Sequence, residues 1–244
     1  MSVFLFPKRL CNELNGLLAK FWWGNQNNGK GMHWGSWDRL GQQKKDGGMG
    51  FRNTECFNLA LLAKQGWRIL SNPKSLVSQI YKQKYFKGSS FLEAKLGSSP
   101  SYIWRSIWKA SELIKEGLRW RVGNGEKIKI WKDKWLNVPT SFRVQSPVMR
   151  LHKEARVEEL IVKEGKIWNE NLIRGIFVES EVEQILSIPL SKMGSEDKMV
   201  WGPSNKGIFS VRSAYFMEMD RRRRSKGETS AEFSSDKRWG RFGN

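Results

Sequence analysis

Apolar residues recur at three- and four-residue spacings along the first half of the chain, a pattern typical of amphipathic helices. The pattern predicts four helices, over residues 8–21, 56–70, 74–86 and 99–117. The helix over 56–70 is apolar on nearly every side, so we expect it to be the central one. Helix 99–117 carries tryptophan and isoleucine at the same spacings, and Gly117 can terminate it. The apolar stripe of the first helix consists of Leu10, Leu14, Leu17, Leu18 and Phe21.

The hydrophobic period falls to two in LRWRVGNGEKIKIWKDKWL, residues 118–136, which predicts a β-hairpin. A two-residue Asn-Gly turn would mix apolar and charged side chains on each face. A three-residue loop, Gly123-Asn124-Gly125, with Gly125 in the left-handed conformation, keeps them apart and is favoured. This register pairs Trp120 with Ile128 and Leu118 with Ile130.

One face of this hairpin is expected to be cationic. Arg121 would lie opposite Lys127, and Arg119 opposite Lys129, although directly opposed like charges weaken a sheet, by about 0.2–1 kcal/mol per pair. Such a face makes more sense if the cations meet phosphates. The candidate nucleic-acid-binding residues are Arg119, Arg121, Lys127, Lys129, Trp131, Lys132 and Lys134. Trp131 is available to stack an unpaired base, whereas we expect the core to contain Trp104, Trp108 and Trp120.

The second half predicts shorter elements. Helices are expected over 169–177 and 179–187, followed by a second hairpin, KMVWGPSNKGIFSV, and a helix from a Ser210 cap to about Asp220. The predicted fold class is α+β, mainly α, with a bundle-like helical first half and two small antiparallel β-hairpins. We expect three segments, namely a basic tryptophan-rich segment, a smaller helical and hairpin segment, and a basic disordered tail, over residues 1–135, 136–219 and 220–244.

Charge narrows the classes of partner. The net charge is +19, and residues 1–135 hold 24 basic against 9 acidic residues. This excess favours nucleic acid or an anionic membrane surface. No apolar run reaches the roughly 18 residues of a membrane span, and the start, MSVFLFPKRL, does not fit a secretory signal. Cys11 and Cys56 are the only cysteines, which fits a reducing, intracellular setting.

The residues support no catalytic, metal or cofactor site. The loop from Gly24 to Gly31 imitates a phosphate-binding P-loop, but a glycine follows Lys30 where that loop needs Ser or Thr. GGMG, residues 47–50, is more typical of a plain turn. His33, His152 and the two cysteines lack zinc-ligand spacing. The six aspartates are scattered, whereas two-metal phosphate chemistry needs clustered carboxylates.

Two charged features leave alternatives open. Asp133 in WKDKW is a possible ligand, although capping a turn or offsetting the neighbouring lysines is favoured. The run Arg221–Arg224 is either a nuclear-import or nucleic-acid patch, or a solvated helix end.

The ordered motifs resemble one known family. KFWWGNQ and MHWGSWDRL, then KKDGGMGFRNTECFNLALLAKQGWRIL, then SYIWRSIWKASELIKEGLRWRVGNGEKIKIWKDKWL resemble the reverse-transcriptase polyprotein of plant non-LTR (LINE-type) retroelements, in the region after the polymerase palm. VWGPSNKGIFSVRSAY resembles the segment that introduces the zinc-binding module of that family, which a ribonuclease H domain often follows. The resemblance covers roughly residues 1–219.

The resemblance implies an RNA-directed DNA polymerase fragment without catalytic residues. The catalytic aspartates of the family would lie upstream of Met1, and its zinc ligands and ribonuclease H carboxylates downstream. Expected partners are RNA or DNA and, in the parent protein, the palm and the zinc-binding and ribonuclease H region, with no membrane. We expect an intracellular, nuclear protein that binds template–primer through its basic surface. The alternatives are a non-catalytic scaffold relic without a specific ligand, and an enzyme in its own right.

Overall fold

The computed structural model describes residues 2–24, 37–41, 49–137, 141–148, 150–162, 164–191 and 193–225. Three predicted features therefore lie wholly or mostly outside the described residues: the Gly24–Gly31 loop, His33, and the tail beyond residue 225. Half of GGMG lies outside as well.

The chain divides into two compact units. Of the described residues, those up to 116 and those from 209 to 225 belong to the first unit, and those from 117 to 208 belong to the second. The first unit thus joins two separate stretches of chain. The predicted segments 1–135 and 136–219 follow the distribution of charge instead, and they stay a prediction.

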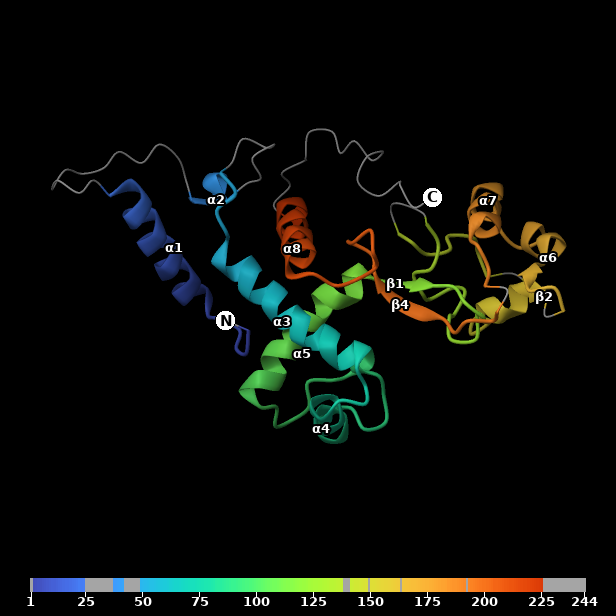
Figure 1. The fold of residues 1–244 in the computed structure, drawn as a ribbon, viewed down its shortest axis with the longest axis horizontal. Coiled ribbons are helices and arrows are strands. Elements are labelled where there is room, and N and C mark those ends of the chain that lie inside the picture. Colours follow the sequence, from blue (N-terminus) through green and yellow to red (C-terminus); the bar gives the residue numbers. More distant parts are fainter. Residues whose placement is uncertain are drawn as a thin grey trace. The chain divides into compact units, whose positions relative to one another are not determined.

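The first unit is helical (Figure 1), and its four predicted N-terminal helices are confirmed. The helices of this unit are α1 (Lys8–Trp23), α2 (Trp37–Leu40), α3 (Thr54–Ser71), α4 (Leu76–Tyr85), α5 (Tyr102–Gly117) and α8 (Val211–Ser225). Asn53 caps α3, because its side chain accepts a hydrogen bond from the N–H of Cys56 at 3.0 Å. Ser75 caps α4 in the same way.

Helix α3 is central, as predicted, and it packs against α1, α4 and α8. It also approaches α5 closely at Gly66, where an added Cβ would lie 2.7 Å from Cδ1 of Ile114. Trp104 of α5 is fully buried, and its ring stacks on Tyr85 of α4 with centroids 4.6 Å apart. Aromatic packing therefore fixes α4 against α5.

The apolar stripe of α1 is less buried than its periodicity suggests. Phe21 is 85% exposed, and Leu10, Leu17 and Leu18 are exposed as well. The buried side of α1 instead contains Cys11, and Asn15 accepts a hydrogen bond from the hydroxyl of Thr54 at 2.7 Å. Helix α1 thus contacts α3 through small and polar side chains.

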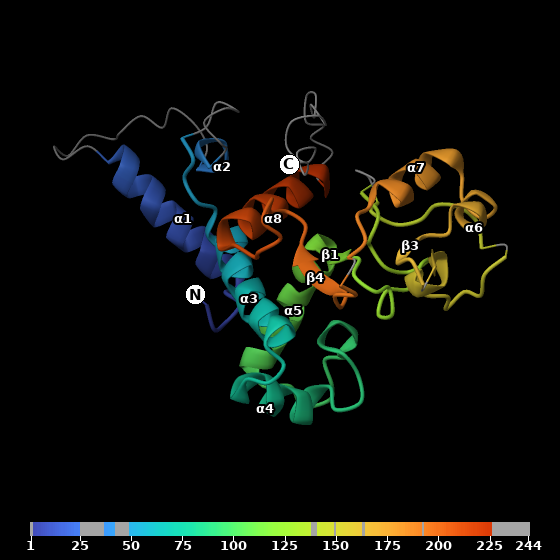
Figure 2. The ribbon, with the colours of Figure 1, turned by 45° about the vertical axis from the view of Figure 1, so that its right-hand side comes forward.

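Among its described residues, the second unit contains two small antiparallel sheets and two short α-helices (Figure 2). Strand β1 (Leu118–Arg121) pairs with β4 (Lys198–Trp201), and β2 (Ile161–Val162) pairs with β3 (Ile167–Trp168). Helices α6 (Glu170–Arg174) and α7 (Glu179–Ser187) follow close to their predicted positions. The mainly helical α+β class is confirmed.

The predicted partners of the strands were wrong. Leu118 lies opposite Trp201, and Arg121 opposite Lys198, so β1 is not the first arm of a local hairpin. Ile128 and Ile130 are fully buried in the core of the second unit, and their backbones bond to Val157 and Ala155 instead of β1.

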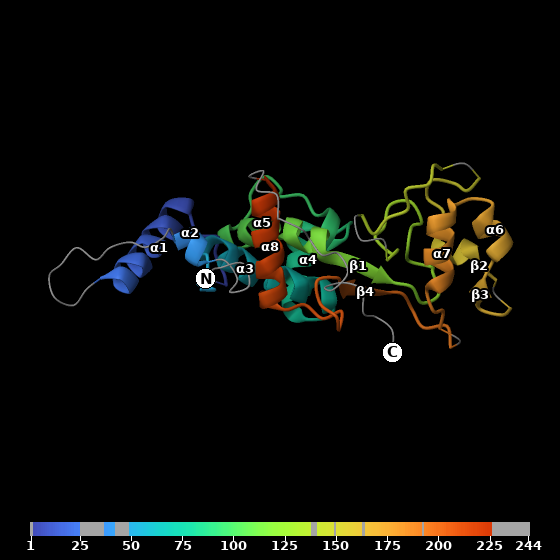
Figure 3. The ribbon, with the colours of Figure 1, turned by 90° about the horizontal axis from the view of Figure 1, so that it is seen from above.

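The second predicted hairpin is also wrong as a two-stranded unit, because its first arm is β4 and pairs with β1. After β4 the chain turns, and the N–H of Trp201 donates to the carbonyl of Gly207 at 2.8 Å. Figure 3 shows β1 and β4 side by side, although a long stretch of chain separates them.

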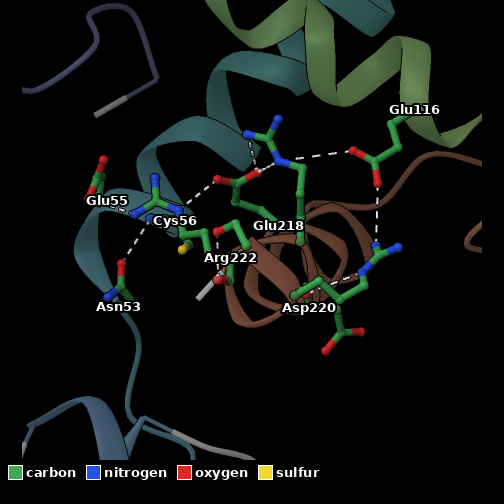
Figure 4. A network of polar contacts seen from close by, with 10 residues as sticks. Asn53, Glu55, Cys56, Glu116, Glu218, Asp220 and Arg222 are labelled. Carbon is green, nitrogen blue, oxygen red and sulfur yellow. Dashed lines mark hydrogen bonds and ion pairs between the residues drawn. The ribbon is translucent and has the colours of Figure 1, made fainter. Parts of the chain in front are cut away.

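Helix α8 is held to α3 by an ionic network around the buried Glu218 (Figure 4). Glu218 is fully buried, and its carboxylate accepts hydrogen bonds from Nε of Arg221 at 2.8 Å and of Arg222 at 2.7 Å. Arg222 also donates to Glu55 of α3 at 2.6 Å. That hydrogen bond lowers the pKa of Glu55 below its ordinary value.

The end of α8 lies beyond its predicted position. The Ser210 cap is confirmed, since the Ser210 hydroxyl accepts the N–H of Ser213 at 3.1 Å, but the helix continues five residues past Asp220, to Ser225. Arg224 lies 3.4 Å from Glu116 of α5. The acids of α3 and α5 thus offset the charge of an arginine-rich helical turn.

We predict that the stabilising effect of Glu55 depends on pH. Because its pKa is lowered in the folded state, the contribution is fully present above its ordinary value of 4.5 and is lost as pH falls through the folded pKa. Glu55→Gln should therefore lower the free energy of unfolding at pH 7 by about 1 kcal/mol, discounted for partial exposure, and by less near pH 3. Urea denaturation at both pH values measures this.

The control is Glu13→Gln, which removes one partner of the exposed Arg9–Glu13 pair and should have little effect at either pH. An equal loss for Glu55→Gln at both pH values would contradict the ionic interpretation.

Candidate nucleic-acid interface

The loop Gly123-Asn124-Gly125 is organised by one buried carboxylate. Asp197, which is 5% exposed, accepts the N–H groups of Gly123 at 2.7 Å, Gly125 at 2.9 Å and Lys127 at 2.8 Å. Gly125 has a φ of 79°, so its predicted left-handed conformation is confirmed. The loop nevertheless encloses a carboxylate and does not join two paired strands.

A second carboxylate fixes the following turn. Asp133 accepts the N–H of Lys129 at 2.7 Å and donates its own N–H to the Lys129 carbonyl at 3.1 Å. The favoured interpretation of Asp133, a turn cap, is therefore confirmed. Burial raises the pKa of Asp133 above its ordinary value, and the Lys129 N–H opposes this shift.

The two predicted arginines have different environments. Arg119 is half-buried, and its guanidinium carbon lies 3.1 Å from the ring centroid of Phe142. Burial lowers the pKa of Arg119 to about 10. Arg121 is exposed, lies opposite Lys198 in the sheet, and has no acidic partner among the described residues. Arg121 is thus the more accessible of the two for a phosphate.

Three predicted lysines form ion pairs. Lys127 lies 2.6 Å from Glu196, and Lys129 lies 2.7 Å from Glu154. Lys132 pairs with the other oxygen of Glu154. Hydrogen bonds from Lys129 and Lys132 lower the pKa of Glu154 to about 2. These exposed pairs are weak, but they reduce the positive potential at the predicted phosphate contacts.

The last two predicted residues are only half-exposed. The indole N–H of Trp131 donates to the carbonyl of His152 at 3.1 Å, and its ring lies 5.6 Å from that of Phe177. The ring also packs against the core of the second unit, which restricts its use as a stacking platform. Lys134 is half-buried, and its carbonyl accepts the N–H of Trp120 at 2.8 Å.

The structure thus brings the seven predicted residues onto one local segment but not onto one bare cationic face. It also shows Asp197, which the sequence analysis missed. The sequence pointed to Asp197 only indirectly. A tight turn with several N–H donors needs a hydrogen-bond acceptor, but the residues of the turn do not show that this acceptor lies some seventy positions further along the chain.

A second basic region was also missed as a site, and it lies in the first unit. Residues 57–111 contain nine Lys and Arg and a single acid, Glu93. The Glu93 carboxylate binds the Ser90 hydroxyl and N–H in a capping box. Among the described residues, none of the nine cations has an acidic partner. The sequence already indicated this basic region, because residues 57–111 contain far more basic than acidic side chains.

The exposed centre of this region lies between α4 and α5. We define the α4–α5 patch as Lys84, Tyr102, Arg105 and Lys109, all exposed. Nζ of Lys84 lies 5.4 Å from the ring centroid of Tyr85, and the guanidinium carbon of Arg105 lies 5.8 Å from that of Tyr102. The Tyr85 hydroxyl donates to Ser101, next to Tyr102, at 2.9 Å.

The arginines of α8 form more ion pairs than the cations of the α4–α5 patch. Arg221, Arg222 and Arg224 all pair with acids of the first unit. Arg222 thus binds Glu55 of α3, whereas the side chain of Arg224 stays 66% exposed. These ion pairs reduce the availability of the arginines for a nucleic acid. The two alternatives for this run, a nucleic-acid patch and a solvated helix end, both stay predictions.

The described residues contain no group of three or more His, Cys, Asp or Glu side chains placed to hold a metal ion. Within the same part of the chain, every helix is too short or too polar to cross a membrane. The fold and surface therefore define a basic, mainly helical α+β protein whose described residues form two small antiparallel sheets.

Comparison with known proteins gives the family. The chain is 42% identical over 137 residues to an uncharacterized mitochondrial protein of Arabidopsis thaliana, AtMg00310, and the match covers 56% of this chain and 89% of that protein. The chain belongs to the same family as this protein. No family model and no solved structure matches the chain.

A second relative is longer. The chain is 28% identical over 230 residues to the Arabidopsis thaliana protein named "Putative ribonuclease H protein At1g65750". The match covers 89% of this chain but only 36% of that protein. The chain thus corresponds to about a third of the length of this relative.

We predict that Asp197→Asn destabilises the protein. An Asn oxygen replaces one of two acceptor oxygens, and its amide group faces an N–H donor, so the free energy of unfolding should fall by about 2–3 kcal/mol. Urea denaturation monitored by tryptophan fluorescence measures the change. Glu126→Gln, at an exposed position of the same turn, is the control and should change it by less than about 0.5 kcal/mol. A similar loss in both variants would argue against the role of Asp197.

Proposed function

We propose that this chain is a retroelement-derived fragment that binds nucleic acid through a basic surface. The observation that carries the proposal is the set of nine cations in residues 57–111 without an acidic partner among the described residues. A surplus of bare cations is the electrostatic signature of a partner with a phosphate backbone. The likeness to a relative named as a ribonuclease H protein supports the same class of partner.

The finer proposal is descent from a LINE-type reverse transcriptase. In such a parent, this region would follow the polymerase palm and lie beside the template–primer, and the zinc-binding and ribonuclease H region would come after it. The ordered motifs that resemble this family support the assignment. A nuclear location remains part of the proposal, although the name of the mitochondrial relative assigns that protein to another compartment.

The seven residues of the segment 118–136 stay proposed contacts, with Arg121 the most accessible. The competing function is a scaffold relic whose charge serves only solubility. The paired lysines of the second unit favour the scaffold for that unit. The nine cations of residues 57–111, which have no acidic partner in the part of the chain that the structure describes, favour binding.

Titration with RNA, DNA and hybrid duplexes at several salt concentrations tests the proposed function. We expect binding whose affinity falls steeply with salt, with a log–log slope near −0.9 for each phosphate contacted on duplex DNA, because each contact releases counterions. Fluorescence anisotropy of labelled duplexes measures it. Absent or salt-independent binding would remove the proposal and leave the scaffold.

We also predict that the chain has no polymerase or nuclease activity of its own. Such chemistry needs clustered carboxylates for divalent metals, and the described residues contain no such cluster. Primer extension and ribonuclease H assays with Mg²⁺ or Mn²⁺ measure this. Metal-dependent turnover by the purified chain would contradict the prediction.

A further inference from the structure

We propose that the α4–α5 patch, and not the segment 118–136, is the principal nucleic-acid contact, and that it binds a single strand by stacking a base on Tyr102. This inference rests on the proposed function and deepens it. It names the surface, the unit of the fold that carries it, and the form of nucleic acid.

The two surfaces differ in whether acidic side chains neutralise their cations. In the segment 118–136, Lys127, Lys129 and Lys132 lie against Glu196 and Glu154. An incoming phosphate must compete there with a carboxylate that is already in place. On the α4–α5 patch, Lys84, Arg105 and Lys109 have no acidic partner among the described residues, so a phosphate meets no such competition.

The aromatic ring of the patch, that of Tyr102, is more accessible to a nucleic-acid base than the ring of Trp131. Tyr102 is 78% exposed, whereas the Trp131 indole is bound to the His152 carbonyl and packed on the core. Aromatic rings that carry successive bases in single-strand sites need a free face beside cations that hold the backbone. Tyr102 and the guanidinium of Arg105 supply this combination within one turn of α5.

The patch is also pre-organised. The ring of Tyr85 stacks on buried Trp104, and its hydroxyl is bonded to the hydroxyl of Ser101. The Ser101 side chain in turn accepts the N–H of Trp104 at 3.2 Å in the first turn of α5. Lys84 over Tyr85 and Arg105 over Tyr102 are thus presented from two helices that aromatic packing fixes together.

An anionic lipid surface is the competing partner. Leu76, Val77 and Ile80 of α4 are exposed, and a basic helix with exposed apolar residues can bind such a surface. Nucleic acid is favoured because the apolar residues occupy the first half of α4, whereas the patch combines its cations with an exposed aromatic ring. The test therefore includes vesicles.

The experiment compares two triple charge reversals in the full chain. The patch variant is Lys84→Glu, Arg105→Glu and Lys109→Glu. The matched control is Arg121→Glu, Lys198→Glu and Lys206→Glu in the second unit, three exposed cations that form no ion pair within 4.0 Å among the described residues, although the charge of Lys198 acts on Glu196. Both lower the net charge equally, so a difference between them reports position. Circular dichroism and urea denaturation verify folding, and Lys→Gln and Arg→Gln versions replace any variant that misfolds.

The probe is a labelled single strand of about 20 nucleotides, longer than a typical site of roughly 4–16 nucleotides. We expect the patch variant to bind at least about tenfold more weakly than the control variant and to lose about 2 from the salt slope, since each single-strand phosphate contact contributes about 0.7. An equal or larger loss in the control variant would overturn the inference while leaving the proposed function standing. Absence of binding by the wild-type chain would remove both.

Substitutions of Tyr102 test the stacking step. Tyr102→Leu should weaken single-strand binding about tenfold, within the range for one stacked base, and should leave duplex binding unchanged, whereas Tyr102→Phe should retain both. Equal binding by the Leu and Phe variants would overturn the stacking assignment. Sedimentation with vesicles of phosphatidylserine and phosphatidylcholine completes the comparison: vesicle binding that depends on the patch, without oligonucleotide binding, would assign the patch to lipid instead.

Discussion

The position of each acidic side chain determines which positive charges of this protein stay exposed and uncompensated. The chain has 24 acids for 43 basic residues, so pairing each acid with one cation would still leave 19 cations without a carboxylate. In the second unit, Glu154 and Glu196 neutralise lysines, and in the first unit Glu55, Glu116 and Glu218 are occupied by α8. The nine cations of residues 57–111 have no acidic partner among the described residues. The positions of the acidic side chains therefore show which cations are available to a phosphate, and the positions of the cations alone do not.

The sequence predicted the helices well and the strand partners poorly, for a physical reason. Helix periodicity, caps and the Gly117 terminus are local, and the buried face of α5 follows from spacing alone. Strand pairing is not local: β1 bonds to β4 because Asp197 and Trp201 close the second unit from a distant part of the chain. The left-handed Gly125 was predictable because its turn chemistry is local.

The candidate site shows the same division. Composition predicted a basic protein with a polyanionic partner, but the face that the sequence favoured depended on a hairpin register that the structure replaced. Once Ile128 and Ile130 turn into the core of the second unit, Lys127 and Lys129 project toward Glu196 and Glu154. Whether a lysine is compensated depends on tertiary neighbours, which no periodicity reveals. The excess of basic over acidic residues in 57–111 was visible in the sequence. Its significance became clear only once the structure showed which cations elsewhere form ion pairs.

The discontinuity of the first unit has a consequence during protein synthesis. Helix α8 covers α3, yet the ribosome makes it only after the 92 residues from Gly117 to Ile208. At roughly 5–20 residues per second, α3 waits on the order of ten seconds for its cover, and β1 waits almost as long for its partner strand β4. A nascent chain therefore passes through a stage in which α3 lacks its covering helix and β1 lacks its partner strand, and chaperones would act on these older parts of the polypeptide.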